Sequence, residues 1–450
     1  MGKLFGTDGI RGIANKELTA ELAFKTGQSG AYVLTKETKN KRPRILIGKD
    51  TRKSGDMLEA ALTAGLCSVG AKVIPLGVIP TPAVAYLTSL YNADAGVVIS
   101  ASHNPCEYNG IKFFNSEGYK LRDEIENEIE DYIEGRKTIG ELPTHGKVGY
   151  VSANHNAVED YVSFAIKTID TDLECLKVAI DCANGASYET AFKALNKLGA
   201  SVEAIHNTPD GKNINDMCGS THIESLQQYV VSIGADVGIA FDGDADRMLA
   251  VDEKGRLIDG DQVMAVCAKH LMDQGKLEKN TLVATVMSNL GLFIAGEKLG
   301  INIPKTKVGD RYVLESMLQH GYNIGGEQSG HVIILDYGTT GDGQLTGATL
   351  LSLINRRQAK LSSIATLMER FPQVLINVKV TAEGKLNFYT DKEIKAEIKR
   401  VTDILGNTGR ILVRVSGTEP LVRVMLEGED EELITKLAEE TATLIKERLA

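Results

Sequence analysis

Three aspartates alternate in the motif FDGDADR, where a strand-like apolar segment ends. Asp242, Asp244 and Asp246 would repel one another unless a hard cation collected their oxygens. An EF-hand calcium loop has similar spacing, with Glu253 at its last acidic position, but that loop needs a glycine where Arg247 stands. The MLAV that follows also predicts a strand, which such a loop would not have there. Because Mg²⁺ keeps few protein ligands and takes phosphate oxygens for the rest, we expect one Mg²⁺ here, with a solvated acidic turn as the alternative.

The motif SASHNP follows another apolar, strand-like segment, AGVVIS at 95–100. Ser102 and His103 suggest a serine hydrolase, but the G-x-S-x-G elbow is absent, and neighbours on a tight loop rarely point at each other. A capped turn is the structural alternative, because serine, asparagine and proline all favour turns. Lys112 lies in the strand-like segment that comes next. The motif therefore offers a nucleophilic hydroxyl at the end of a rigid strand.

A glycine-rich loop, GGEQSGH, occupies residues 325–331. Its glycines allow close approach of the backbone, and Glu327, Gln328, Ser329 and His331 offer directional hydrogen bonds. Such a loop suits a ligand with many hydroxyls, although a simple glycine turn explains the motif equally well.

The segment RVSGTEPLVRV near the C-terminus places small polar residues between two strand-like segments. Backbone N–H groups, hydroxyls and guanidinium groups together can hold a phosphate. The residues that would do so are Arg414, Ser416, Gly417, Thr418 and Arg423. A hairpin turn with arginines at the sheet edge is the alternative.

The elements that carry these loops alternate between strand-like and helix-like segments, from RILIG at 44–48 to YNIGGEQSG at 322–330. This alternation predicts βαβ units, and ligands bind at the carboxyl ends of strands in such sheets. After residue 369 the order changes to strand, helix, strand, strand, helix. We expect three similar α/β domains with mixed or parallel sheets and a smaller α+β domain, one for each loop. The expected boundaries are 1–150, 151–253, 254–368 and 369–450.

Composition excludes several classes of protein. The net charge of −10 over 450 residues argues against a nucleic-acid or anionic membrane partner. The N-terminal MGKLFGTDGIRG lacks the apolar core of a signal peptide, and no segment is apolar enough to span a membrane. Six cysteines form no CxxC pair, which favours reduced thiols and a cytoplasmic location.

Taken together, the hydroxyl, the cation site, the sugar-type loop and the phosphate cradle indicate phosphoryl transfer on a phosphorylated polyol. Two alternatives belong to other classes. A metal-dependent phosphatase would use a carboxylate or a metal-bound water as nucleophile and would need no serine. A sugar-phosphate sensor without activity would need the cradle but not the three aspartates.

In its order of motifs, FGTDGIRG, SASHNP, DGDADR, GEQSG and RVSGTEP, the chain resembles the α-D-phosphohexomutases from end to end. The resemblance implies that Ser102 is phosphorylated and that its phosphate completes the Mg²⁺ shell of the three aspartates. Arg247 would help to hold the sugar or the phosphoryl group. The other implied roles are proton transfer by Lys112 and His103, bracing of the serine loop by Arg11, contacts of Glu327 and Ser329 with sugar hydroxyls, and binding of the distal phosphate by Arg414, Ser416, Gly417, Thr418 and Arg423.

Two markers narrow the substrate within this family. They are FGTDGIRG itself and GEQSG, where relatives that act on mannose and glucose phosphates commonly read GEMSG. The resemblance thus implies interconversion of glucosamine 6-phosphate and glucosamine 1-phosphate, with glucosamine 1,6-bisphosphate as intermediate and primer. A preference for mannose or glucose phosphates is the alternative. The implied partner is a small sugar phosphate, and the resemblance leaves room for a homodimer.

Overall fold

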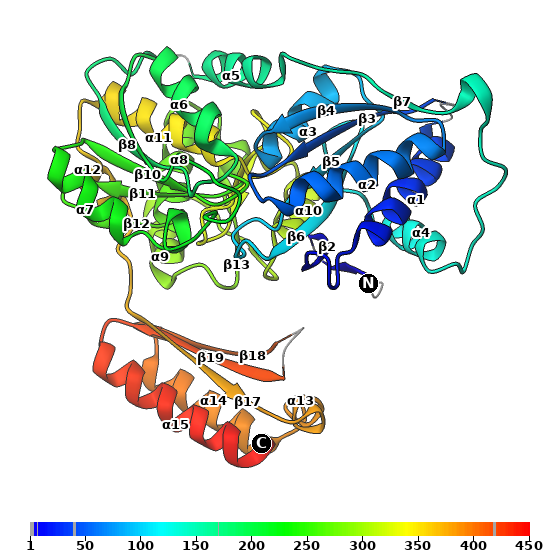
Figure 1. The fold of residues 1–450 in the computed structure, drawn as a ribbon. Coiled ribbons are helices and arrows are strands. Elements are labelled where there is room, and N and C mark those ends of the chain that lie inside the picture. The colour runs from blue at the N-terminus through cyan, green and yellow to red at the C-terminus, as the bar shows by residue number, and fades with distance from the viewer. Residues whose placement is uncertain (1–3, 7, 39–41, 170, 417–419) are drawn as a thin grey trace. The chain divides into compact units, whose positions relative to one another are not determined.

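Four β-sheets with covering helices organise the described part of the chain (Figure 1). The computed structural model describes residues 4–6, 8–38, 42–169, 171–416 and 420–450. It divides into two compact units, Met1–Met287 with Ile301–Thr366, and Ser288–Gly300 with Leu367–Ala450. Among the helices of the described residues, none is long and apolar enough to cross a membrane.

The first sheet has parallel strands at one side and antiparallel strands at the other. All five residues of β5 are buried, as expected for the apolar segment before SASHNP. The order of the strands is β1 (Phe5–Gly6), β2 (Gly9–Ile13), β6 (Tyr108–Asn115), β5 (Ala95–Ile99), β3 (Arg44–Lys49), β4 (Lys72–Val78) and β7 (Tyr150–Val151).

Helices cover both faces of this sheet because its strands alternate their side chains between two cores. Ile45 and Ile47 of β3 pack in one core with residues of α1 (Ala20–Thr38), α2 (Ser54–Ser68) and α4 (Asp123–Ile133). Leu46, between them, packs in the other core with α3 (Thr81–Leu90) and α5 (Ala157–Thr168). The sheet is thus held from both sides, which makes its strand ends rigid supports for loops.

Two smaller mixed sheets follow in the same unit. The second has the order β12 (Leu257–Ile258), β11 (Met248–Asp252), β10 (Val237–Phe241), β8 (Lys177–Asp181) and β9 (Ser201–Ile205), with α6 (Ser187–Lys197) and α7 (Glu224–Ile233). The third has the order β14 (Lys305–Thr306), β13 (Val283–Thr285), β15 (Ile324–Gly326) and β16 (Val332–Ile334), with α8 (Gly260–Asp273), α10 (Asp310–His320), α11 (Gly343–Arg357) and α12 (Leu361–Ile364). Short 3-10 turns lie at His145–Lys147, Gly219–Thr221, Glu278–Asn280 and Ala365–Leu367.

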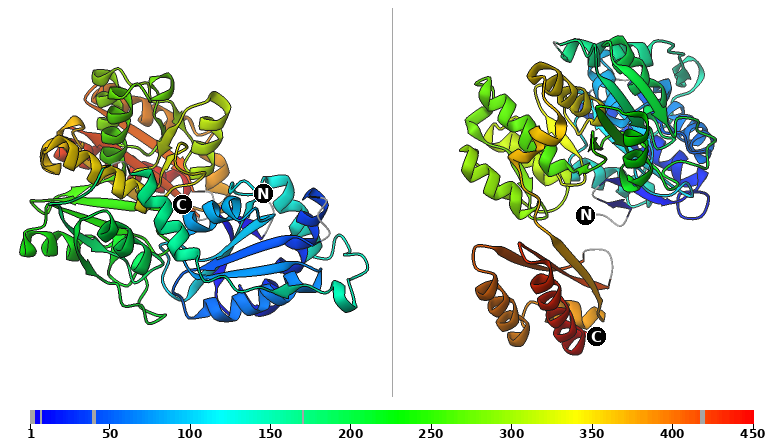
Figure 2. Two further views of the ribbon diagram at one scale, coloured as in Figure 1. Left: turned by 90° about the horizontal axis from the view of Figure 1, so that it is seen from above. Right: turned by 90° about the vertical axis from the view of Figure 1, so that its left-hand side faces the viewer.

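The second unit is an antiparallel sheet with helices on one face (Figure 2). Its order is β17 (Gln373–Lys379), β19 (Leu421–Gly428) and β18 (Gly409–Val415), with α13 (Ala382–Asn387), α14 (Lys392–Leu405) and α15 (Glu431–Leu449). It also contains α9 (Leu290–Leu299), which comes from the middle of the chain. The Asn289 side chain donates to Phe371 O (3.0 Å), and Leu290 N donates to Glu427 Oε2 (3.0 Å), so polar contacts hold the start of α9 in this unit.

The expected fold class is confirmed: three α/β sheets are followed by a smaller α+β unit. The strand predicted at MLAV is present as β11, which supports the rejection of a calcium loop. The domain boundaries at 150, 253 and 368 stay a prediction. No local pattern in the sequence predicts that α9 joins the C-terminal unit.

Candidate active site

The three alternating aspartates lie in the loop between β10 and β11, and all three are buried. One carboxylate oxygen of each lies within 4.8 Å of the others. Burial, together with the Asp246 and Asp244 charges, raises the pKa of Asp242 well above its usual range. Oδ1 of Asp244 and Oδ1 of Asp246 are buried without a hydrogen-bond partner in the described structure. Oxygens that crowd together and lack donors fit a small, hard divalent cation such as Mg²⁺.

Two helix N-termini hold this loop in place. Thr81 N, at the start of α3, donates to Asp244 O (3.0 Å), and Gly343 N, at the start of α11, donates to Ala245 O (3.0 Å). The partial positive charge of a helix N-terminus favours the acidic loop. Ala245 has a φ of 56°, a left-handed conformation that costs free energy in a residue other than glycine. The loop is therefore stabilised from outside in a conformation that it would not adopt alone.

Ser102 meets the acidic loop directly. It follows β5 with a φ of 51°, and its Oγ donates to Asp242 Oδ2 over 2.6 Å. Its backbone N–H donates to Ser100 Oγ (2.9 Å), and Ser100 Oγ donates to Asp50 Oδ2 (2.5 Å). A Cβ on Gly243 would come within 2.6 Å of Ser102 O, so only glycine allows the two loops to approach this closely.

The carbonyls of the serine loop are held by two residues that the sequence analysis did not single out. Arg52 Nη2 donates to Ser102 O (3.1 Å) and Asn104 O (2.5 Å). Asn215 Nδ2 donates to the same two oxygens (2.9 and 3.0 Å). Arg52 could have been suspected, because it closely follows the end of β3, a strand parallel to β5. Asn215 lies in a long loop of the second sheet, and no sequence pattern marks it.

His103 and Arg247 lie together beside the serine. Arg247 Nη1 is 3.1 Å from His103 Nδ1, and Ser102 Oγ is 3.4 Å from the same nitrogen. Burial, with the positive charges of Arg247 and Arg11, lowers the pKa of His103 to about 4. At neutral pH the imidazole is therefore uncharged and able to accept a proton. Arg11 also pairs with Asp8, as part of the antiparallel strand next to β6.

Lys112 is buried between two carboxylates. Its Nζ lies 3.0 Å from Asp244 Oδ2 and 3.1 Å from Asp8 Oδ2. Burial opposes the charge, but the Asp244 and Asp8 carboxylates outweigh it and raise the pKa of Lys112. Thr81 Oγ1 donates to the same Asp244 oxygen over 2.7 Å. Lys112 therefore carries a positive charge beside the expected cation site.

This pairing continues as a closed ring of alternating charges that returns to the aspartate loop. Lys120 Nζ is 2.7 Å from both Asp8 Oδ1 and Asp310 Oδ2. His331 Nε2 is 3.6 Å from Asp310 Oδ2, and its Nδ1 is 3.5 Å from Asp246 Oδ2. Burial opposes a charge on His331, but Asp246 and Asp310 outweigh it and raise its pKa. The ring joins the first and third sheets to the acidic loop. No motif in the sequence marked three of its members, Asp8, Lys120 and Asp310.

The glycine-rich loop connects β15 and β16, next to the aspartate loop, and Met248 N donates to Gly330 O (3.1 Å). Glu327 is held by Gly309 N, which donates to its Oε1 over 3.0 Å. Gln328 Nε2 is 3.4 Å from Oδ2 of Asp259, the N-cap residue of α8. The Gln328 side chain is therefore directed toward the start of α8. Ser329 is exposed. Of the polar side chains in this loop, Glu327 and Ser329 thus remain the best candidates to contact a ligand.

In the second unit, Arg414 and Arg423 stand directly opposite each other on β18 and β19. Like charges at directly opposite positions of two strands are unfavourable. Burial and Arg423 lower the pKa of Arg414. Ser416 is buried at the end of β18. The predicted residues Gly417 and Thr418 lie outside the described part of the chain.

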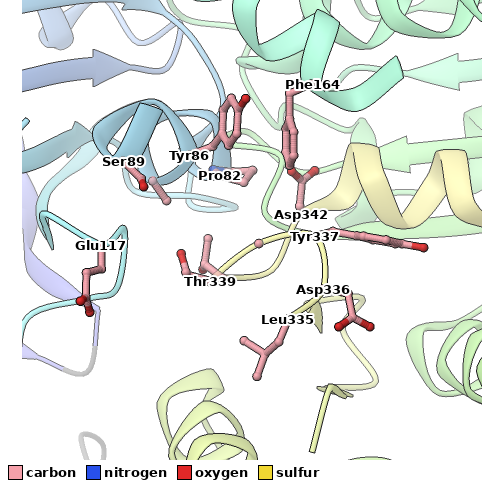
Figure 3. Close-up of a pocket in the computed structure, with 13 residues that line it drawn as sticks. Pro82, Tyr86, Ser89, Glu117, Phe164, Leu335, Asp336, Tyr337, Thr339 and Asp342 are labelled. Carbon is pink, nitrogen blue, oxygen red and sulfur yellow. The ribbon is translucent and has the colours of Figure 1, made fainter. Parts of the chain in front are cut away.

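A cavity of about 230 Å³ lies apart from these groups, and Figure 3 shows its lining. Tyr86 and Phe164 stack there with ring centroids 3.8 Å apart. Glu117, Asp336 and Asp342 contribute carboxylates, and the lining includes none of the predicted site residues. An acidic, partly aromatic lining does not suit a sugar phosphate, so the cavity is not the reaction site.

The structure therefore brings Ser102, His103, Lys112, Arg247 and Arg11 around the three aspartates, and places the glycine-rich loop beside them. The arginine pair belongs to the separate second unit.

Comparisons with known proteins identify the family of the chain. Four family signatures described as Phosphoglucomutase/phosphomannomutase match the chain: alpha/beta/alpha domain I at 2–139, domain II at 158–255, domain III at 259–371 and the C-terminal domain at 375–444. Phosphoglucosamine mutase of Clostridium acetobutylicum is 58% identical over 448 residues and covers 100% of both chains. Phosphoglucosamine mutase of Acetivibrio thermocellus is 60% identical over 449 residues, again over 100% of both chains.

Solved structures share the fold. A Phosphoglucomutase/phosphomannomutase family protein of Burkholderia thailandensis has a TM-score of 0.82 at 23% identity, over 99% of this chain and 98% of its own. N-acetylphosphoglucosamine mutase of Aspergillus fumigatus, solved with GlcNAc-6P and magnesium, has a TM-score of 0.72 at 17% identity, over 99% of this chain and 96% of its own. The resemblance drawn from the sequence motifs is confirmed. The chain belongs to the α-D-phosphohexomutase family of phosphoglucomutases and phosphomannomutases, and the two relatives at 58% and 60% identity over the full chain are phosphoglucosamine mutases.

Proposed function

We propose that this chain is an isomerase that interconverts glucosamine 6-phosphate and glucosamine 1-phosphate, on the way to UDP-N-acetylglucosamine. The observation that carries the proposal is the buried Ser102, whose Oγ is 2.6 Å from Asp242 of the acidic loop. A serine so placed can store a phosphoryl group, which splits one difficult transfer into two easier ones. The full-length phosphoglucosamine mutase relatives support the choice of substrate.

One Mg²⁺ per chain would be held by Asp242, Asp244, Asp246 and an oxygen on phosphorylated Ser102. The two buried oxygens without donors, Oδ1 of Asp244 and Oδ1 of Asp246, support this assignment. When bound, the cation neutralises charge on the phosphoryl oxygens as bonds form and break.

In the first transfer, a hydroxyl of the sugar monophosphate attacks the phosphorus of phosphorylated Ser102. The bond between phosphorus and Ser102 Oγ breaks, glucosamine 1,6-bisphosphate forms, and the released serine oxygen takes up the proton that the sugar hydroxyl gives up. The hydroxyl proton must go to a base, and His103 fits because its low pKa keeps it neutral at pH 7. Lys112 stays protonated, so it would stabilise negative charge on the phosphoryl oxygens. Arg247 would bind the same oxygens.

In the second transfer, the bisphosphate presents its other phosphate to the free serine. His103, whose Nδ1 is 3.4 Å from Ser102 Oγ, would take the serine proton and pass it to the departing sugar oxygen. The phosphorus–oxygen bond to the sugar breaks, and the sugar oxygen regains a proton. Between the two transfers the bisphosphate must turn around, because one serine serves both ends of the sugar.

The remaining predicted residues would bind the rest of the ligand. Glu327 and Ser329 would contact sugar hydroxyls, and Arg11 would support the serine loop. The phosphate that is not reacting would bind to Arg414, Ser416, Gly417, Thr418 and Arg423. The opposed arginines on β18 and β19 support this phosphate site. The partner would thus be a small sugar phosphate, and the location would be cytoplasmic. Light scattering would test whether the chain forms a homodimer.

The covalent store is tested by intact mass. After incubation with glucosamine 1,6-bisphosphate, the protein should gain one phosphoryl group. Ser102→Ala should gain none and lose mutase turnover, whereas Ser116→Ala, in an exposed turn, should behave as wild type. A phosphatase or a sensor would show no phosphate on Ser102.

The substrate is tested by comparing kcat/KM for glucosamine 1-phosphate, glucose 1-phosphate and mannose 1-phosphate, each with its own 1,6-bisphosphate as primer. We expect glucosamine 1-phosphate to be preferred, with some activity on glucose 1-phosphate. A preference for mannose or glucose phosphate would instead identify a phosphomannomutase/phosphoglucomutase with the same mechanism.

A further inference from the structure

A second group of metal-ligating side chains lies outside the active site. Asp181 ends β8, His206 follows β9, and Cys218 lies in the loop that leads to Gly219. One ligand atom of each residue lies within 4.8 Å of the others. Asp181 and Cys218 are buried, and His206 keeps 31% of its side chain exposed. In the described residues this is the one such group besides the three aspartates.

Backbone donors fix the carboxylate of this group. Ala183 N donates to Asp181 Oδ1 (2.9 Å), and Gly219 N donates to Asp181 Oδ2 (3.0 Å). His206 Nδ1 is 2.9 Å from the same Oδ2. The surrounding loops hold five of the fourteen non-glycine residues that have positive φ in the described chain: Ala183, Asn184, His206, Asn215 and Met217. Strain of this kind persists only where surrounding contacts maintain it.

We propose that Asp181, His206 and Cys218 bind a second divalent cation, of the zinc class. A thiolate, an imidazole and a carboxylate together select Zn²⁺ rather than Mg²⁺, which prefers oxygen ligands alone. The cation would replace the thiol proton and the proton shared by His206 and Asp181. Two negative ligands balance its charge, and the exposed edge of His206 leaves a fourth position for water.

The site would act on structure rather than on chemistry, because it ties together the loop that supports the serine. Asn215, between His206 and Cys218, donates to Ser102 O and Asn104 O. The backbone of the same loop also accepts a hydrogen bond from the start of α2, since Lys53 N donates to Gly211 O over 3.0 Å. A cation held by His206 and Cys218 would thus join the two ends of this loop and stabilise the contacts that Asn215 makes between them. The inference does not depend on the identity of the sugar.

Cobalt is a suitable probe, because a Co²⁺–thiolate bond gives a charge-transfer absorption that carboxylate ligands do not give. The protein is titrated with Co²⁺ in excess Mg²⁺, so that the aspartate loop is saturated. We expect a charge-transfer band that saturates at one equivalent and is displaced by Zn²⁺. Cys218→Ser should abolish the band. His206→Asn should weaken binding at least tenfold, and asparagine tolerates the positive φ of this position. Cys175→Ser, at an exposed thiol, is the matched control and should keep the band.

Thermal unfolding provides a second readout, which does not depend on the absorption of a Co²⁺–thiolate bond. Zn²⁺ in excess Mg²⁺ should raise the Tm of the wild type and of Cys175→Ser, but not of Cys218→Ser or His206→Asn. Circular dichroism of each variant checks that it folds. The proposal is overturned if folded wild type gives no band, or if the band survives in Cys218→Ser. The group would then be an ion pair of His206 and Asp181 with a buried thiol beside it.

Discussion

The charge of Lys112 can be removed with little change in shape by Lys112→Met. The ammonium group is buried, with 2% of the residue exposed, and contacts Asp244 and Asp8. Removing one partner of a buried ion pair leaves the other charge without compensation and typically costs about 3–5 kcal/mol. Asp8 keeps Lys120 and Arg11, so the greater part of the loss should arise at Asp244. We therefore expect the free energy of unfolding to fall by about 3 kcal/mol without Mg²⁺, at the lower end of that range.

Mg²⁺ should then restore part of this stability. A cation on the three aspartates supplies the positive charge that Asp244 has lost, so Mg²⁺ should stabilise Lys112→Met more than it stabilises the wild type. Turnover should stay low even in saturating Mg²⁺, because the phosphoryl oxygens no longer face an ammonium group. Lys112→Arg, which keeps the charge, is the control and should lose much less stability.

The measurement is urea unfolding of wild type and both variants, with EDTA and with Mg²⁺, beside mutase turnover under the same conditions. The reasoning fails if Lys112→Met unfolds at the same urea concentration as wild type in EDTA. It also fails if Mg²⁺ stabilises both proteins equally, since the lysine and the cation would then not share Asp244.

Three further predictions concern other groups of the site. Asp244→Asn removes one charged ligand, so this variant should need a higher Mg²⁺ concentration for half-maximal activity. Full activity of the wild type in excess EDTA would contradict a metal requirement. Burial and the charges of Arg247 and Arg11 lower the pKa of His103 from 6.5 to about 4, so the folded state favours the neutral imidazole. The free energy of unfolding should therefore fall as the pH drops from about 6.5 to about 4. His103→Gln should flatten this dependence in urea titrations from pH 7 to pH 4, and an unchanged slope would assign it to other groups. Arg423→Ala should lower kcat/KM about ten- to a hundredfold through a higher KM, since a charge-assisted contact is worth about 1.5–3 kcal/mol, and unchanged kinetics would place the phosphate elsewhere.

Local patterns predicted much of the fold, because alternation and apolar segments act within a single element. The apolar segment before SASHNP is β5, and the helix expected between the first two strands after residue 369 is present as α14, Lys392–Leu405. The transfer of α9 to the second unit could not be predicted. It depends on contacts of Asn289 and Leu290 with residues more than eighty positions away, which no local pattern encodes.

The same limit applies to the site. Motifs singled out Ser102 and the three aspartates from residue type and spacing, and the structure brings them into contact. They did not identify Asp8, Lys120 or Asp310, since a single aspartate or lysine in a sequence gives no sign of its partner. The partners come from different sheets and meet only in the folded chain. Residues that bind a ligand can thus be read from sequence more easily than residues that position them.

The charges around the acidic loop bear on whether the proposed cation and the proposed phosphoryl group would bind there together. Asp242, whose pKa is raised, and His331, whose Nε2 accepts a hydrogen bond from Gly341 N, are left out of the charge count. The remaining four carboxylates face four cationic groups: Asp8, Asp244, Asp246 and Asp310 against Arg11, Lys112, Lys120 and Arg247. The buried site is therefore close to neutral before any ligand binds. A phosphoserine adds a charge of about −2, and Mg²⁺ adds the opposite charge, so only the two together keep the balance. Either alone would leave about two charges uncompensated in a buried place, where uncompensated charge is costly. Phosphorylation of Ser102 and Mg²⁺ binding should thus favour each other, and the ring of ion pairs is what sets this coupling.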